Sequence, residues 1–418
     1  MNENNRLSRV QILIQQKKYA EAEKTLNELL STDAGNAHYL LYMAEIKLQM
    51  ENYEMARKII DSAIGISPDY ADLYFQKSRI VQMQENYDEA EEVIRHAILL
   101  DPNNAGYYAF QAHLRLNRKK FKEALDIANR ALEIEPENLL ALNTRSTALT
   151  KLNRKEESFK TIEGALREDP NNAFTHANYG WSLLEKGDHK KAMEHFKESL
   201  KSDPDFEYAQ SGILQAMKAK NPIYSLYLQY AFFMQKLTAR YQWTVIIAFY
   251  LGFRILKGIA KSNEALQPYL IPLLIGLAII AFSTWVINPI GNLFLRFNKY
   301  GQLLLSKKEK LSSGFVALSL AVFAVGLALY LILGDQRYLM VAFFGFAMMV
   351  PCSVMFAPTK FKDALLIYTI AMAAVGAGAI FLTFTTPVLV NTMSIVFLFG
   401  FVIFQWVANF LLIKENNR

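Results

Sequence analysis

Residues 173–206 read AFTHANYGWSLLEKGDHKKAMEHFKESLKSDPDF, and features of this stretch recur along the first half of the chain at intervals of 34 residues. One such feature is the position of His189, which is usually aromatic in the other copies. The equivalent residues at this spacing are Tyr19, Tyr53, Tyr87, Phe121 and Lys155. A fixed period of this length is the sequence signature of a repeat array.

Two further features keep the same spacing. Small residues follow the first position by three residues, at Ala22, Ala56, Ala90, Ala124, Ser158 and Ala192. A second set of small residues is Ala63, Ala97, Ala131, Ala165 and Ser199. Fifteen residues after the first position come Ala34, Pro68, Pro102, Pro136, Pro170 and Pro204.

These residue types predict a helix, a turn and a second helix in each repeat. Small side chains let two helix backbones approach closely, so we expect Ala90 to face Ser78 and Ala124 to face Ala112. Proline is tolerated only near helix ends, because its φ is fixed and it lacks an N–H group. Each repeat therefore holds two helices of about a dozen residues.

The pattern resembles the tetratricopeptide repeat (TPR) family, a 34-residue helix pair. In residues 173–206 the family's positions are occupied by Tyr179, Gly180, Leu183, Ala192, Phe196 and Pro204, while His176 replaces the family's Trp. The resemblance implies six units over residues 3–206, the first being a degenerate cap. A solvating helix over about residues 207–220 completes a predicted solenoid domain of residues 1–222.

The second half of the chain is apolar and almost free of charge, and about 20 such residues span a bilayer. We predict six spans, at residues 243–259, 269–288, 314–333, 338–357, 364–385 and 388–413. In the first span, Arg254 and Lys257 must extend to the interface. Residues 223–242 are predicted to form an interfacial linker helix, because the apolar run there is short and contains Gln229. The predicted fold is thus all-α, with a solenoid followed by a transmembrane bundle of residues 243–418.

Residues 289–313 are long for a connection between spans. Ile290, Leu293, Phe294 and Phe297 recur at helical spacing, which predicts an amphipathic helix under the cytoplasmic leaflet. The basic residues from Lys307 to Lys310 could bind anionic lipid headgroups. The alternative is that these charges only orient the protein in the membrane.

Charge separates the two halves. Residues 1–222 hold 30 Lys and Arg against 34 Asp and Glu, whereas residues 223–418 hold 15 against 5. A nucleic-acid-binding solenoid would carry a basic excess, so no nucleic acid is expected as a partner. Short loops rich in Lys and Arg remain in the cytoplasm. The loops on one side hold Lys218, Lys220, Lys236, Arg240, Arg296, Lys299, Lys307, Lys308, Lys310, Lys360, Lys362, Lys414 and Arg418. The opposite loops hold only Lys257, Lys261 and Arg337.

This distribution predicts a multi-pass protein of the cell membrane, the inner membrane if the source is bacterial. Both termini and the solenoid lie in the cytoplasm. The polar start of the chain, residues 1–9, agrees because it lacks a signal-peptide pattern.

Known catalytic patterns are absent from the sequence, including phosphate-binding loops, the zinc motif H-E-x-x-H and the nucleophile turn G-x-S-x-G. Cys352 is a lone cysteine inside a span, where a small apolar role is expected. The spacing of His189 and His195 does not place them on one helical face. The span interiors lack Asp and Glu, which ion-coupled pumps require. We therefore expect no catalytic residue, cofactor or metal, and a protein that is not an enzyme.

The resemblance places partner contacts on the first helices of successive repeats, which line a concave groove. The candidate groove residues are Leu41, Glu45, Phe75, Arg79, Met83, His113, Asn143, Lys151, Trp181 and Glu185. Their mixed apolar and charged character suits an extended peptide or a partner helix. Chaperone-binding members hold a carboxylate with a Lys and Asn pair, and no repeat here has that pair.

The leading hypothesis is a membrane-anchored adaptor or scaffold that mediates protein–protein interaction at the cytoplasmic membrane face. The alternative is a channel, carrier or membrane-enzyme subunit for a neutral or lipid substrate, regulated by the repeats. This alternative stays open because six spans exceed what an anchor needs. A membrane-embedded glycosyl or acyl transferase is a third option. Membrane lipid is an expected partner, and homo- or hetero-oligomers in the membrane are open.

Overall fold

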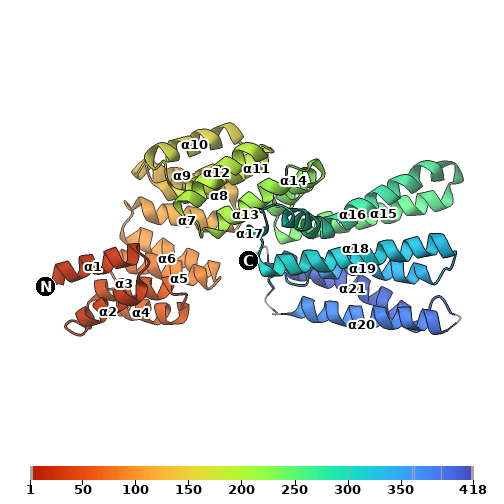
Figure 1. Cartoon of the computed structure of the whole chain (residues 1–418). Coiled ribbons are helices and arrows are strands. Elements are labelled where there is room, and N and C mark those ends of the chain that lie inside the picture. Colours follow the sequence, from red (N-terminus) through yellow and green to blue (C-terminus); the bar gives the residue numbers. More distant parts are fainter. Residues whose placement is uncertain (1–2, 300, 360, 362, 387, 416–418) are drawn as a thin grey trace. The chain divides into compact units, whose positions relative to one another are not determined.

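The computed structural model describes residues 3–299, 301–359, 361, 363–386 and 388–415, apart from the side chains of residues 3, 4 and 415. The residues described form helices and turns and contain no strand, so the all-α prediction is confirmed (Figure 1). The chain divides into two compact units, Met1–Asn178 and Tyr179–Arg418. The predicted domain boundary at residue 222 lies inside the second unit.

The first unit is a series of antiparallel helix pairs. Its helices are α1 (Glu3–Gln15), α2 (Tyr19–Leu30), α3 (Ala37–Gln49), α4 (Tyr53–Ile66), α5 (Ala71–Met83), α6 (Tyr87–Leu100), α7 (Ala105–Asn117), α8 (Phe121–Ile134), α9 (Leu139–Lys151), α10 (Lys155–Glu168) and the first residues of α11 (Ala173–Lys186). The repeated prolines follow the ends of α4, α6, α8 and α10, as predicted.

Small residues bring the two helices of a pair together. The hydroxyl group of Ser78 on α5 donates to the carbonyl oxygen of Ala90 on α6 at 2.6 Å, and both residues are fully buried. Ser146 and Ser158 repeat this contact in α9 and α10, where their hydroxyl oxygens lie 2.8 Å apart. The predicted approach of Ser78 and Ala90 is therefore confirmed.

The turn inside each pair has one residue with positive φ. These residues recur every 34 positions, at Lys17, Glu51, Glu85, Lys119, Asn153 and Gly187. The N–H group of the next residue bonds back across the turn, as from Asn86 to the Val81 carbonyl at 3.1 Å. This is the Schellman arrangement that closes a helix end. Backbone geometry thus follows the 34-residue period even where the side chains do not.

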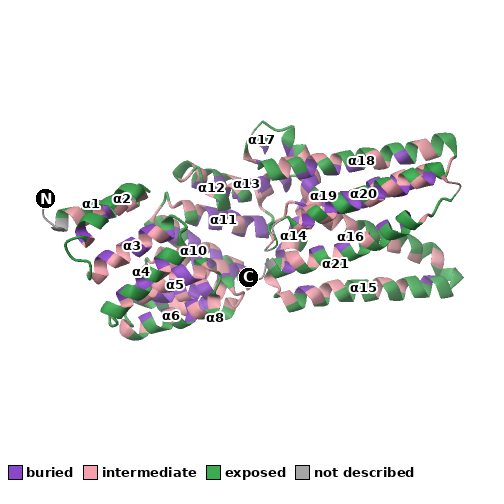
Figure 2. Cartoon of the chain, turned by 90° about the horizontal axis from the view of Figure 1, so that it is seen from below, coloured by how far each residue is buried: buried purple, intermediate pink, exposed green. Residues whose placement is uncertain are grey.

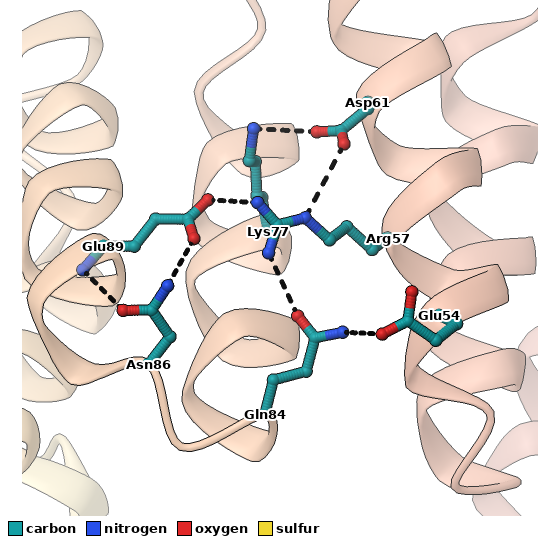
Figure 3. A network of polar contacts seen from close by, with 7 residues as sticks. All are labelled: Glu54, Arg57, Asp61, Lys77, Gln84, Asn86 and Glu89. Carbon is teal, nitrogen blue, oxygen red and sulfur yellow. Dashed lines mark hydrogen bonds and ion pairs between the residues drawn. The ribbon is translucent and has the colours of Figure 1, made fainter.

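Ion pairs and amides join neighbouring pairs along one edge (Figure 3). Arg57 on α4 contacts Glu89 on α6 at 2.6 Å, and its guanidinium also donates to Gln84 at 3.2 Å. Lys77 on α5 contacts Asp61 on α4 at 2.7 Å. Figure 3 shows these side chains converging from three helices, so the network fixes how one pair lies on the next.

The second unit begins with the rest of α11. Its other helices are α12 (His189–Ser202), α13 (Glu207–Lys218), α14 (Pro222–Lys236), α15 (Ala239–Ser262), a 3-10 turn (Glu264–Leu266), α16 (Gln267–Arg296), α17 (Gly301–Leu304), α18 (Lys307–Leu333), α19 (Tyr338–Val354), α20 (Ala364–Thr385) and α21 (Thr392–Glu415). Helix α13 packs on α12 as the predicted solvating helix, and it also contacts α16 and α17.

Five helical segments of the described chain are long and apolar enough to cross a membrane: Ala239–Ser262, Glu264–Arg296, Lys307–Leu333, Ala364–Thr385 and Thr392–Lys414. The fourth predicted span, residues 338–357, is α19, a shorter apolar helix of 17 residues. At 1.5 Å per residue it is about 26 Å long, close to the thickness of a bilayer core of about 30 Å. The last span begins at Thr392, four residues after its predicted start at Val388.

The predicted amphipathic loop of residues 289–313 is corrected by the structure. Helix α16 continues through Pro289 to Arg296, and α18 already begins at Lys307. Proline inside a membrane helix is tolerated because neighbouring groups satisfy the freed carbonyl. Ile290 and Phe294 therefore belong to the end of α16 instead of a separate surface helix.

Burial in the bundle is concentrated on α18, α19, α20 and α21, whereas α15 is mostly exposed (Figure 2). The closest approach is between α18 and α19. A methyl group at Gly345 would lie 2.3 Å from the backbone nitrogen of Phe323, and one at Gly326 would lie 2.5 Å from that of Ala342. Such glycine contacts let membrane helices pack backbone to backbone.

Candidate protein-binding groove

Glu45 and Arg79, predicted to line the groove, form an ion pair between α3 and α5. Their charged atoms lie 2.6 Å apart, and Gln76 donates to the same carboxylate oxygen at 2.7 Å. Burial raises the pKa of Glu45, but Arg79 and the hydrogen bonds from Gln49, Arg79 and Gln76 outweigh it, so the pKa is lowered. Arg79 is therefore already neutralised and is not a free anchor for an acidic partner.

Phe75 lies in a cluster of aromatic rings. Its ring centroid is 5.3 Å from that of Tyr107 and 5.4 Å from that of Phe110, both on α7. The Arg79 guanidinium lies 5.8 Å from the Phe75 centroid. The Tyr107 hydroxyl donates to Asp72 at 2.6 Å, and burial together with this bond raises the pKa of Tyr107. Phe75 thus joins two neighbouring repeats.

The next candidates differ in exposure. Met83 is 51% exposed at the end of α5, and Leu41 on α3 is half-buried. His113 on α7 lies 3.2 Å from the Asn117 amide, and burial lowers its pKa, which favours the neutral ring. Lys151 is half-buried. The pKa of Lys119 is lowered first by the burial of Lys119 and second by the positive charge of Lys151. Of this set Met83 is the apolar side chain most open to a partner.

Asn143 has a structural role that its position did not predict. It is 2% exposed, and its amide donates to the Thr175 hydroxyl at 2.9 Å. It also accepts from the Asn178 amide at 3.0 Å. Its polar atoms are thus used between α9 and α11, so Asn143 stabilises the stack and does not present itself to a partner.

Trp181 and Glu185, on α11 in the second unit, are covered by the chain itself. The Trp181 indole N–H donates to the Tyr208 carbonyl of α13 at 3.2 Å, and its ring centroid lies 6.3 Å from that of Phe232 on α14. Glu185 is 6% exposed and contacts the Lys236 ammonium at 2.8 Å. We call Trp181, Glu185 and Tyr208 the terminal groove surface.

The sequence does not predict a polar cluster that forms at α16. Asn288 donates to the Tyr227 hydroxyl at 3.0 Å and accepts from the Tyr224 hydroxyl and, at 3.5 Å, from the Lys218 ammonium. Lys218 is 6% exposed, and burial lowers its pKa to about 8, although Glu309 opposes this. No local motif distinguishes these residues, because they come from α13, α14 and α16.

Within the described chain, His, Cys, Asp and Glu side chains form no group of three that could hold a metal. Cys352 is buried on α19, and its sulfur lies 3.8 Å from the Ser319 hydroxyl. Burial of this kind suits the packing role expected for it.

Two models of the tetratricopeptide repeat match the chain, one over residues 13–65 and 47–114 and the other over residues 173–206. No curated protein matches it.

Among solved structures, YrrB is described as a TPR protein with an unusual peptide-binding site. It is 19% identical to this chain, the match covers 44% of this chain and 96% of YrrB, and the TM-score is 0.33. A tetratricopeptide repeat protein from Parabacteroides merdae is 17% identical, covers 50% and 81%, and has a TM-score of 0.44. The pilF protein of Pseudomonas aeruginosa is 16% identical, covers 47% and 88%, and has a TM-score of 0.38.

The family assignment rests on the two sequence models and on the repeat geometry. Between the matched segments, Lys119 and Asn153 keep the positive φ and the 34-residue spacing of the other turns. Residues 13–114 and 173–206 therefore match the tetratricopeptide repeat family, and the turns between these segments keep the same 34-residue spacing.

Proposed function

We propose that the chain is a membrane-anchored scaffold whose TPR solenoid recruits a soluble protein to the cytoplasmic membrane face. The main support for this proposal is that one chain combines TPR repeats with apolar helices long enough to cross a membrane. Arrays of this family present extended surfaces to partners. The proposed partner-binding region is the part of the groove around Met83, an exposed apolar side chain on α5, the helix that also carries Phe75.

The orientation rests on the basic residues at one end of the bundle. The Arg296 guanidinium lies 3.5 Å from the Lys310 carbonyl, so the end of α16 and the start of α18 meet. Helix α13 contacts α16 and α17 at this end. Positive charge next to spans is retained in the cytoplasm. This supports a cytoplasmic solenoid, and it supports anionic lipid as a second partner of the exposed lysines near the start of α18.

The alternative, in which the bundle handles a neutral or lipid substrate, is less favoured by the bundle's polar contacts. Thr369 donates to the Leu365 carbonyl at 2.7 Å, and Asn391 donates to Ala379 and Thr383 at 3.1 Å and 3.0 Å. These side chains bond within and between neighbouring helices, which is the use expected for packing.

The test is partner capture by the full-length protein from a membrane extract. A Met83→Asp variant places a charge on the exposed groove position and should lose the captured protein. The matched control is Leu99→Asp on α6, which is 79% exposed and lies on a second helix of a repeat. If both variants retain the partner, or both lose it, the groove around Met83 is not the binding region.

A further inference from the structure

Helix α14 has two apolar faces with different surroundings. Tyr224, Leu228 and Phe232 recur every four residues and are 3%, 6% and 4% exposed. The other face carries Ile223, Leu226, Tyr230 and Phe233, which are 70%, 74%, 42% and 53% exposed. An isolated surface helix needs only one apolar face. The buried face is the one that packs inside the second unit.

The C-terminal end of the buried face fills the terminal groove surface. Phe232 and Lys236 lie four residues apart on α14 and meet Trp181 and Glu185, which lie four residues apart on α11. Residues at this spacing share one helix face. An aromatic pair and an ion pair therefore match in register. The resemblance to the repeat family also places these two α11 positions in the predicted groove.

The N-terminal end of α14 is held by the membrane helix α16. Tyr224 and Tyr227 both bond Asn288, and the Gly291 backbone lies against the Tyr224 ring. Beyond α14, the Gln242 amide donates to the carbonyls of Met234 and Leu237 at 2.9 Å and 3.1 Å. One short helix thus connects the terminal groove surface with the bundle.

We propose that the terminal groove surface is a helix-binding site whose resident occupant is α14. Its external ligand is a partner helix that carries an aromatic residue and, four residues later, a Lys or Arg. This inference rests on the proposed function, because it concerns the same solenoid. A partner that replaces Phe232 and Lys236 also loosens the contacts of α14 with Asn288, so binding is transmitted to α16.

The second apolar face makes such an exchange feasible. Once α14 leaves α11, both of its faces need an apolar environment, and the adjoining bilayer interface provides one. The tethered helix competes with an external ligand at high effective concentration. The apparent affinity of an external helix is its intrinsic affinity multiplied by the fraction of sites that α14 leaves open. Weakening α14 should therefore reveal the site.

The experiment uses the full-length protein in detergent and a labelled peptide of residues 222–236, with binding measured by fluorescence anisotropy. The double variant Phe232→Ala/Lys236→Ala loosens α14, and Leu226→Ala on the exposed face is the matched control. We expect the double variant to bind the peptide at least about tenfold more tightly than the control, a difference of about 1.4 kcal/mol. Equal binding by the two proteins would overturn the inference.

Charge reversal separates specific binding from partition into detergent. Glu185→Lys, added to the double variant, should abolish binding of the natural peptide. A peptide in which the residue equivalent to Lys236 is Glu should restore it. If Glu185→Lys leaves binding unchanged, the peptide does not occupy the terminal groove surface, and the inference fails.

Hydrogen exchange verifies that the variants remain folded. In the double variant, α14 amides should exchange faster while those of α18 and α19 stay unchanged. If α14 exchange is unchanged, the helix is a fixed structural part, which overturns the inference. If Met83→Asp retains the captured partner while the peptide still binds, the proposed function fails and this site remains. If the partner is captured through Met83 but the peptide does not bind, only the inference about the terminal groove surface fails.

Discussion

The Lys236 ammonium lies 2.8 Å from a Glu185 carboxylate oxygen, and this carboxylate is almost inaccessible to solvent. The pair joins α14 to α11, so it should contribute to the stability of the second unit. Removing one partner of a buried pair leaves a charge without compensation.

Lys236→Met should therefore lower the free energy of unfolding of the second unit by about 1–3 kcal/mol. Glu185→Gln combined with Lys236→Met should recover part of this loss, because no charge then remains buried. Thermal unfolding of the purified full-length protein gives the values for a double-mutant cycle. Additive effects of the two substitutions would show that the pair does not act as a unit.

The lowered pKa of Lys218 predicts how the stability of the protein changes with pH. Its pKa is about 8 in the folded protein and 10.5 when unperturbed, so between these values the unfolded state holds more protons. Stability from this group therefore rises with pH from about 8 to 10.5 and is least favourable below pH 8. Lys218→Met should raise stability at pH 7 by about 1–3 kcal/mol, because a buried charge is removed.

The measurement is the unfolding midpoint of wild type and Lys218→Met between pH 7 and pH 10, and the gap should narrow as pH rises. Lys220→Met, an exposed lysine two residues away, is the control and should change stability little. A gap that widens with pH would mean that Lys218 is stabilised as an ammonium.

Gly345→Ala should force α18 and α19 apart, because the added methyl group would lie 2.3 Å from the Phe323 nitrogen and 2.7 Å from the Ser319 carbonyl oxygen. Overpacking of this kind costs about 1–3 kcal/mol. Gly378→Ala is the matched control, since nothing lies within 4 Å of its added carbon. Resistance to unfolding by a denaturing detergent should fall for the first variant and not for the second. Equal resistance would contradict the backbone contact.

The orientation can be read from single cysteines in a Cys352→Ser background. A cysteine in place of Lys308 lies at the start of α18, and one in place of Arg337 lies beyond its end. In intact cells an impermeant maleimide should label position 337 and not position 308, because the basic end is cytoplasmic. Labelling at 308 with protection at 337 would reverse the topology.

The repeat spacing was sufficient to predict the helix pairs, because a small residue marks every unit and a proline marks five of the six. It did not reveal the turn geometry, because only Gly187 and Asn153 are residue types that favour a positive φ, and Lys17 and Glu85 at the same position are not. The second span was predicted to end at residue 288, but α16 continues through Pro289 to Arg296, because proline is tolerated in membrane helices. The candidate groove residues lie on α3, α5, α7, α9 and α11, the first helices of their pairs, and their role in binding stays a prediction; their availability depends on distant segments. Asn143 is used by α11, and Trp181 is covered by α14.

Photo-crosslinking in intact cells tests the scaffold hypothesis most directly. A photoreactive residue is placed at Met83 in one full-length variant and at Leu99 in another, and the crosslinked products are identified. The scaffold account predicts a discrete soluble protein crosslinked from position 83 and absent from position 99. Crosslinks from position 83 to lipid alone, or the same products from both positions, would contradict it.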